Sequence, residues 1–271
     1  LDSTNNFYNP DTKPDLYLQA FFGRLNLWYA NMYLLTVNYR RDGSSRFKAN
    51  RWGDFGGVAA AWRISQENFL KDSSTLSDLK LRASIGKTGQ QDIGDAARID
   101  YLKTYNTSAD LYYQFGVDFI PISKPNGYNQ LLKWEESIKY NLGLDFGFAN
   151  NRVTGTLDFY LADTKDLINI VAEGPLENLR VIGFKNFGEL QSKGIDFGLN
   201  VKAIKKENFT LSFNYNASYN DIEITKLPIN GVDKGNVGLG GFVQTWSEGL
   251  SPFAFWVYQQ VYDNNGKAIE G

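Results

Sequence analysis

The sequence of 271 residues contains no cysteine, no histidine and a single methionine. The first two absences exclude disulfide frameworks, zinc sites, thiol catalysis and acid–base catalysis by histidine. The sequence has no large excess of either charge, because it contains 28 Lys and Arg and 30 Asp and Glu. We therefore expect no basic surface for nucleic acid. No apolar run approaches the ~18 residues of a transmembrane helix, although the alternating strands of a membrane β-barrel would not produce one either.

The pattern that is present is a strict alternation of apolar and polar residues. Between Ile138 and Phe148, six apolar residues alternate with five polar residues or glycines. A period of two places one set of side chains on each face of a strand, whereas a helix needs spacings of three and four. The strands predicted in this way are 23–29, 33–39, 52–64, 79–86, 138–148, 153–161, 195–203 and 209–220. Weaker candidates are 99–105, 110–118 and 253–262.

The connections between these strands alternate in length. Those at 30–32, 149–151 and 204–208 are short, that at 65–78 is intermediate, and those at 42–51, 88–135, 165–189 and 222–252 are long. An outer-membrane barrel has this plan, with short turns at the periplasmic rim and long loops outside. Runs of eleven residues in phase also match the ~9–11 residues that a tilted strand needs to cross a bilayer. We therefore expect an all-β, antiparallel transmembrane barrel with lipid-facing Leu142, Leu144, Phe197, Leu199, Leu211 and Phe213.

Several sequence blocks resemble the SusC/RagA family of TonB-dependent outer-membrane transporters. The blocks are 40–47 (RRDGSSRF), 51–53 (RWG), 60–65 (AAWRIS), 79–90 (LKLRASIGKTGQ), 132–135 (LKWE), 140–145 (YNLGLD), 165–167 (KDL), 186–189 (NFGE) and 193–195 (KGI). They occur in the order of the family and extend over about 40–203.

The resemblance implies a 22-strand barrel filled by an N-terminal plug, of which this chain would supply about ten strands. Residues 1–271 would be a partial barrel domain, with the plug and the C-terminal strands outside this sequence, which also lacks a Met start or a signal peptide. The implied partners are a SusD-like surface lipoprotein, the TonB complex acting through the plug, and outer-membrane lipid. The implied function is import of an oligosaccharide, or of a peptide, with no cofactor, no metal and no covalent chemistry, so the protein is not expected to be an enzyme.

Four cations are expected in the lumen. Arg63, Lys80 and Arg82 lie on strand faces opposite the apolar residues and would point inward, toward the plug or the cargo. Arg40 belongs to a basic segment that would line the transport path or pair with plug carboxylates. The alternative is a structural turn, with Gly43 at a positive φ and the arginines paired with strand neighbours.

Cargo contacts are expected from aromatic residues in the long loops, because apolar sugar faces stack on rings. The candidates are Tyr112, Tyr113, Phe115, Trp246 and Trp256, with packing between loops as the alternative. The even-numbered polar residues from Thr210 to Asn220 would form either a wall suited to sugars or a plain solvated face. From a different class, a soluble carbohydrate-binding β-sandwich remains open.

Overall fold

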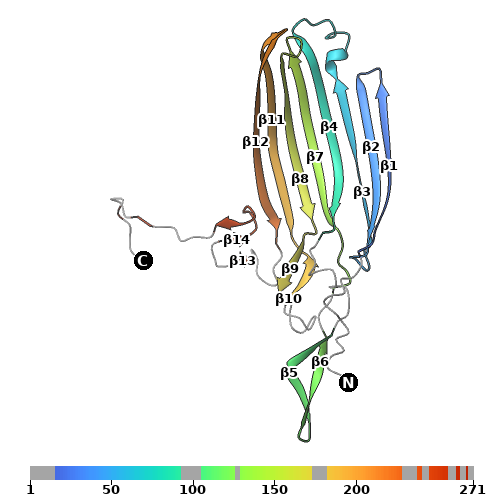
Figure 1. The fold of residues 1–271 in the computed structure, drawn as a ribbon, viewed down its shortest axis with the longest axis vertical. Helices are drawn as coiled ribbons and strands as arrows, with labels where there is room; N and C mark the ends of the chain where they lie inside the picture. The colour runs from blue at the N-terminus through green and yellow to red at the C-terminus, as the bar shows by residue number, and fades with distance from the viewer. Residues whose placement is uncertain are drawn as a thin grey trace.

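The computed structural model describes residues 16–92, 105–125, 129–172, 182–227, 237–239, 244–255, 261–262 and 267. A single antiparallel sheet of eight strands dominates these residues, in the order β1-β2-β3-β4-β7-β8-β11-β12 (Figure 1). Its strands are β1 (Leu18–Tyr29), β2 (Tyr33–Ser44), β3 (Trp52–Arg63), β4 (Leu76–Gln90), β7 (Glu135–Phe148), β8 (Val153–Lys165), β11 (Glu189–Lys206) and β12 (Phe209–Lys226). All eight correspond to strands predicted from the alternation, and the sheet is an up-and-down meander that remains open in this chain.

Three smaller sheets lie in the segments that follow β4, β8 and β12. They are formed by β5 (Tyr105–Phe115) with β6 (Asp118–Pro125), by β9 (Ile168–Ala172) with β10 (Ile182–Asn186), and by β13 (Val237–Leu239), β14 (Gln244–Trp246) and β15 (Ala254–Phe255). A 3-10 helix, η1 (Ile64–Gln66), begins the connection from β3 to β4. Among the described residues, none of the helices has the length and hydropathy of a membrane span.

The two ends of the large sheet differ in the connections they carry. The tight turns at 30–32, 149–152 and 207–208 share one end with η1, and the long connections leave from the other (Figure 1). Ala30 and Asn31 adopt φ of 52° and 54°, and Ala149, Asn150 and Asn151 do the same in the next short turn. These left-handed residues close two of the hairpins. The position of the short turns at one end and the long connections at the other confirms the expected sorting.

Two local predictions were wrong. The expected single strand over 110–118 is interrupted, because β5 ends at Phe115 and Gly116 turns the chain at φ 63° into β6. Gly43 was expected at a positive φ, yet it lies in extended β2, where Trp52 covers it so closely that a Cβ would lie 2.9 Å from the ring. Of the other weak candidates, 99–104 and 256–260 lie outside the described residues.

The hydrophobic core lies at the end of the sheet that carries the long connections. It comprises Phe47, Phe55, Leu132, Trp134 and Phe184, with Ile168 packed against it. The sheet itself leaves large apolar side chains exposed, including Leu142 and Phe213 at 51% and 59%. Because this eight-stranded sheet leaves side chains exposed on both faces, we expect each face to make further contacts.

Candidate functional site

The cross-strand register separates the large sheet into an apolar and a polar face. Leu144 pairs with Leu157, which pairs with Phe197, so apolar side chains form a row across β7, β8 and β11. The residues expected to face lipid all lie on this apolar face, and none of them is buried. They are Leu142, Leu144, Phe197, Leu199, Leu211 and Phe213.

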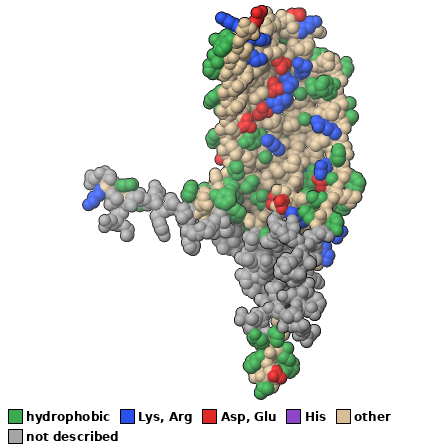
Figure 2. Space-filling view, viewed as in Figure 1, with side chains coloured by type: hydrophobic (Ala, Val, Ile, Leu, Met, Phe, Trp, Pro, Cys, Tyr) green, Lys and Arg blue, Asp and Glu red, His purple; other side chains and the backbone are tan. Residues whose placement is uncertain are grey.

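The four cations expected in the lumen lie on the opposite, polar face. Arg63 pairs directly with Lys80, Arg82 follows two residues later on β4, and Arg40 shares their face on β2. Figure 2 shows this face, where basic and acidic side chains form a diagonal band across the sheet. The structure thus brings Arg63, Lys80 and Arg82 together and places Arg40 nearer the long connections.

An ion-pair network joins three strands within this band. Lys80 Nζ lies 2.5 Å from Asp145 Oδ2, and Arg82 Nη2 lies 2.8 Å from Asp145 Oδ1. The same Arg82 nitrogen lies 2.9 Å from Asp158 Oδ2. These side chains are 18–32% exposed, so water screens the pairs only partly. The network links β4, β7 and β8 and neutralises most of the charge on this part of the wall.

Gly143 allows Arg82 to reach across an intervening strand. Arg82, Gly143 and Asp158 are register partners on β4, β7 and β8. A Cβ added to Gly143 would lie 2.7 Å from Arg82 Cζ, so any larger residue would displace the guanidinium. The ion pair between β4 and β8 therefore depends on the missing side chain at 143.

Tyr160 crosses β11 in a similar way, over Gly194. Its hydroxyl donates to Asn220 Oδ1 on β12 at 2.9 Å, and the hydroxyl of Ser192 donates to the same oxygen. The Tyr160 ring also carries the Lys139 ammonium 4.6 Å from its centroid. On the polar face, side chains thus reach across an intervening strand and bind residues on the strand beyond it.

Polar groups, most of them uncharged, continue the face across β11 and β12. Asn200 donates to Asn214, and Ser218 donates to Asp196. A groove of about 470 Å³ lies here, and its polar lining includes Asp78, Asp145, Thr156, Asn200, Asn214 and Asn216. The even-numbered polar residues of β12 therefore contribute to a concave surface as well as to a solvated face.

The arginines near the start of the β2–β3 connection pair with carboxylates. Arg40 Nε donates to both oxygens of Asp42, at 2.7 and 2.6 Å. The buried Arg46 donates through Nη1 to the Gln91 carbonyl at 2.8 Å and to Asp92 Oδ1 at 2.6 Å. Of the expectations for this basic segment, these contacts favour pairing within the wall, because Arg40 binds Asp42 on its own strand and Arg46 binds the residues that follow β4.

The loop-end cluster of Phe47, Phe55, Leu132, Trp134 and Phe184 was not found by sequence reasoning. The Trp134 ring packs 5.5 Å from Phe47 and 5.2 Å from Phe55, and its Nε1 donates to the Arg51 carbonyl at 3.1 Å. The signal was available, because Phe47 and Trp134 belong to two of the motif blocks. The cluster fixes the bases of three connections that are far apart in the sequence.

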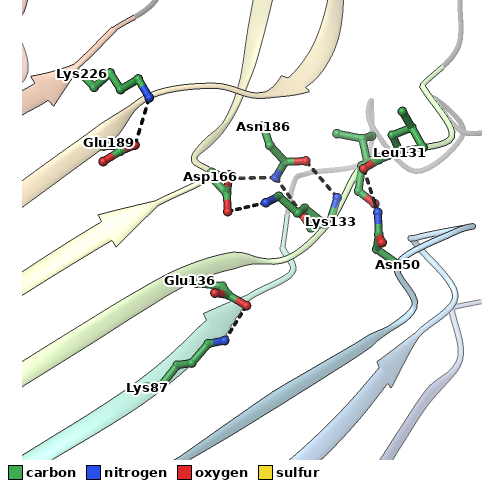
Figure 3. Close-up of polar contacts among 10 residues, drawn as sticks. Asn50, Lys87, Leu131, Lys133, Glu136, Asp166, Asn186, Glu189 and Lys226 are labelled. Atoms are coloured by element: carbon green, nitrogen blue, oxygen red, sulfur yellow. Dashed lines mark hydrogen bonds and ion pairs between the residues drawn. The ribbon is translucent and has the colours of Figure 1, made fainter.

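Polar contacts also link the strand ends and the connections at this end of the sheet (Figure 3). Asn186 Nδ2 donates to the carbonyls of Lys133 and Asp166, both at 2.8 Å, and the Lys133 ammonium lies 2.6 Å from the Asp166 carboxylate. Asn50 donates to the Leu131 carbonyl at 3.0 Å. The loop-end cluster and these contacts together form a packed and hydrogen-bonded rim from which the long connections project.

The aromatic candidates for cargo contact lie in two separate small sheets. Tyr112, Tyr113 and Phe115 are 48–60% exposed on β5, with the rings of Tyr113 and Phe115 4.6 Å apart. Trp246 on β14 packs edge-on against Phe253 at 5.5 Å. Trp256 lies outside the described residues. The structure therefore groups the first three and does not bring Trp246 to them.

No group of three or more carboxylates that could hold a metal ion occurs in the part of the chain that the structure describes. The polar face offers hydrogen-bond donors and acceptors, and the loop end offers exposed rings. This arrangement can bind and guide a hydrophilic molecule.

Comparisons with known proteins agree with this architecture. The family described as "TonB dependent receptor-like, beta-barrel" matches residues 1–269. The TonB-dependent receptor SusC of Bacteroides thetaiotaomicron is 44% identical over 263 residues, which cover 93% of this chain. The TonB-dependent receptor P39 of Formosa agariphila is 34% identical over 86% of this chain.

Among solved structures, the RagAB peptide importer in its closed-closed state superposes with a TM-score of 0.75 at 25% identity over 93% of this chain. The chain covers 28% of that structure's chain, 26% of SusC and 21% of P39. It therefore spans about a quarter of the length of the relatives it matches.

Proposed function

This chain belongs to the TonB-dependent receptor β-barrel family, and from that premise we propose that it forms part of the wall of an outer-membrane importer. Proteins of this family are receptors and transporters of the outer membrane. The work of the wall is selective passage, and its energy would come from the TonB complex acting through a plug. The division into a partial barrel here and a plug elsewhere is part of the proposal.

The apolar face would contact the hydrocarbon of the membrane, and the polar face would line the lumen. Support comes from the contiguous apolar face, on which Leu142 and Phe213 are 51% and 59% exposed, because soluble monomers rarely expose large apolar patches. A barrel is also one of the few structures that satisfy all backbone hydrogen bonds in lipid. Arg40, Arg63, Lys80 and Arg82 would then face the plug or the water-filled lumen.

We propose an oligosaccharide as the cargo, and the 44% identity to SusC is the observation that carries this proposal. The groove beside Asn200, Asn214 and Asn216 supports it, because amides both donate and accept hydrogen bonds and so suit a cargo rich in hydroxyls. The exposed rings of Tyr112, Tyr113 and Phe115, together with Trp246 and Trp256, would stack on sugar faces at the loop end.

A peptide is the second candidate cargo, favoured by the structural likeness to the RagAB peptide importer. Either cargo would be received by a SusD-like surface lipoprotein seated on the long-connection end. The packed rim around Trp134 would give that partner a base.

Uptake by cells that make the complete protein and its lipoprotein partner tests the proposal. We expect labelled oligosaccharides to be imported and oligopeptides of similar size to be excluded. Asn216→Leu should reduce uptake several-fold, because it removes an amide from the lumen groove. Tyr215→Leu is the matched control, since its side chain is on the apolar face. Import of peptides alone would mean that the cargo is a peptide and not an oligosaccharide. Equal effects of the two variants on uptake would contradict the assignment of the polar and apolar faces.

A further inference from the structure

An aromatic shelf lies on the apolar face, at the end of the sheet that carries the short turns. Tyr29, Tyr33 and Trp62 are register partners on β1, β2 and β3, and their rings stack with centroids 6.3 and 6.4 Å apart. All three are exposed, Tyr29 to 72%. Rings at this level of a membrane barrel lie at the boundary between hydrocarbon and headgroups.

A carboxylate is fixed against this shelf. Glu67, just beyond η1, accepts a hydrogen bond from the Tyr33 hydroxyl at 2.6 Å and one from Trp62 Nε1 at 2.9 Å. Both donors use Oε1, so Oε2 has no partner among the described residues and can accept from another molecule. The bonds from Tyr33 and then Trp62 lower the pKa of Glu67, which keeps the group ionised at neutral pH.

An apolar groove begins at the shelf and runs along the sheet. Its first part, of about 380 Å³, is lined by Tyr33, Leu35, Trp62 and Leu81, and its floor is formed by Ala60 and Ala83. These two alanines are register partners, and they also line a second part of about 650 Å³ that continues toward Leu142 and Phe159. The short side chains thus leave a channel between taller neighbours, open along the face expected to meet lipid.

We propose that the shelf, Glu67 and the groove form a binding site for one phospholipid with a primary ammonium headgroup. The ammonium would donate to Glu67 Oε2 beside the aromatic rings, and an acyl chain would lie over Ala60 and Ala83. This proposal rests on the proposed placement of the apolar face in the membrane.

Charge and chemistry select this occupant. A lone carboxylate repels a headgroup whose only charge is a phosphate, whereas an ammonium offers three donors and a positive charge. Aromatic faces attract the same cation.

Native mass spectrometry of the complete protein, released from nanodiscs of equal phosphatidylethanolamine and phosphatidylglycerol, tests the headgroup. We expect retained phosphatidylethanolamine to exceed phosphatidylglycerol, and Glu67→Gln to lower that ratio by about threefold, because an exposed ion pair contributes little more. The amide still accepts from Tyr33 and Trp62, so the shelf should persist. Glu207→Gln, an exposed change in the β11–β12 turn, is the matched control and should leave the ratio unchanged.

A second pair of variants tests the groove. Ala60→Leu with Ala83→Leu should reduce retention of phosphatidylethanolamine, whereas Ala217→Leu, an exposed change on the same face of β12, should not. Equal retention of both lipids by the unchanged protein, or no response to Glu67→Gln, would overturn the site. A protein that inserts into nanodiscs and imports cargo without this preference would refute only the lipid site. A protein that fails to insert would refute the proposed function as well.

Discussion

Arg82 and Asp158 form an ion pair of 2.9 Å although they lie on β4 and β8, which do not pair with each other. The guanidinium passes over Gly143 on the intervening strand β7 and also bonds to Asp145 of that strand at 2.8 Å. Three strands of the wall are therefore joined by one side chain, in addition to their backbone hydrogen bonds.

Gly143→Ala should destabilise the barrel by about 1–3 kcal/mol, because the new methyl group overlaps the guanidinium and forces it away from Asp158. Samples of the complete protein are heated to increasing temperatures and run on gels without boiling. The temperature at which the folded band disappears measures the change. Gly86→Ala is the control, since a Cβ there would meet its nearest atom, the Gly56 carbonyl oxygen, at 3.9 Å. Equal losses of stability in both variants would mean that the passage of Arg82 over Gly143 does not stabilise the barrel.

Asp158→Asn should destabilise the barrel, whereas Asp196→Asn should not. Asp158 and Asp196 are direct register partners on β8 and β11, so their like charges repel each other by about 0.2–1 kcal/mol. Asp158→Asn leaves Arg82 with one carboxylate and lowers the unfolding temperature. Asp196→Asn removes the repulsion, and its amide oxygen still accepts from Ser218, so the unfolding temperature should stay constant or rise. A lower unfolding temperature for Asp196→Asn would contradict the proposed repulsion between these two carboxylates.

Arg46→Ala should loosen the connection that follows β4. Arg46 is 6% exposed and holds Gln91 and Asp92, at the start of that connection, through a single nitrogen. Limited proteolysis of the complete protein should show faster cleavage between 91 and 134, while Arg40→Ala, which removes an exposed pair with Asp42, should not. Unchanged cleavage of the Arg46 variant would show that other contacts hold the segment.

Acidification should remove the contribution of Glu67 to stability. Hydrogen bonds from Tyr33 and Trp62 lower its pKa in the folded protein, so ionised Glu67 stabilises the fold above its ordinary pKa. That contribution is lost as the pH falls through the lowered value. The unfolding temperatures of the unchanged protein and of Glu67→Gln should therefore differ at neutral pH and converge in acid. A difference that grows on acidification would reverse the assigned sign.

Much of the fold followed from the sequence because a strand has a period of two. Leu142 and Leu144 alternate with Asn141 and Gly143, and this pattern alone placed both leucines on one face. It also placed Lys80 and Arg82 on the other face. The β5–β6 turn was missed because one glycine, Gly116, decides it, and the alternation around it gave no sign of a break.

The sequence by itself determined the eight long strands, their two faces and the sorting of short and long connections, because these depend on residues that are neighbours in the chain. Only the tertiary structure decided which residues meet across strands: Arg82 with Asp158, Trp134 with Phe47 and Phe55, and Glu67 with Tyr33 and Trp62. Those contacts depend on strand register and on the path of the connections. Both are fixed by packing between segments tens of residues apart, which a local pattern does not encode.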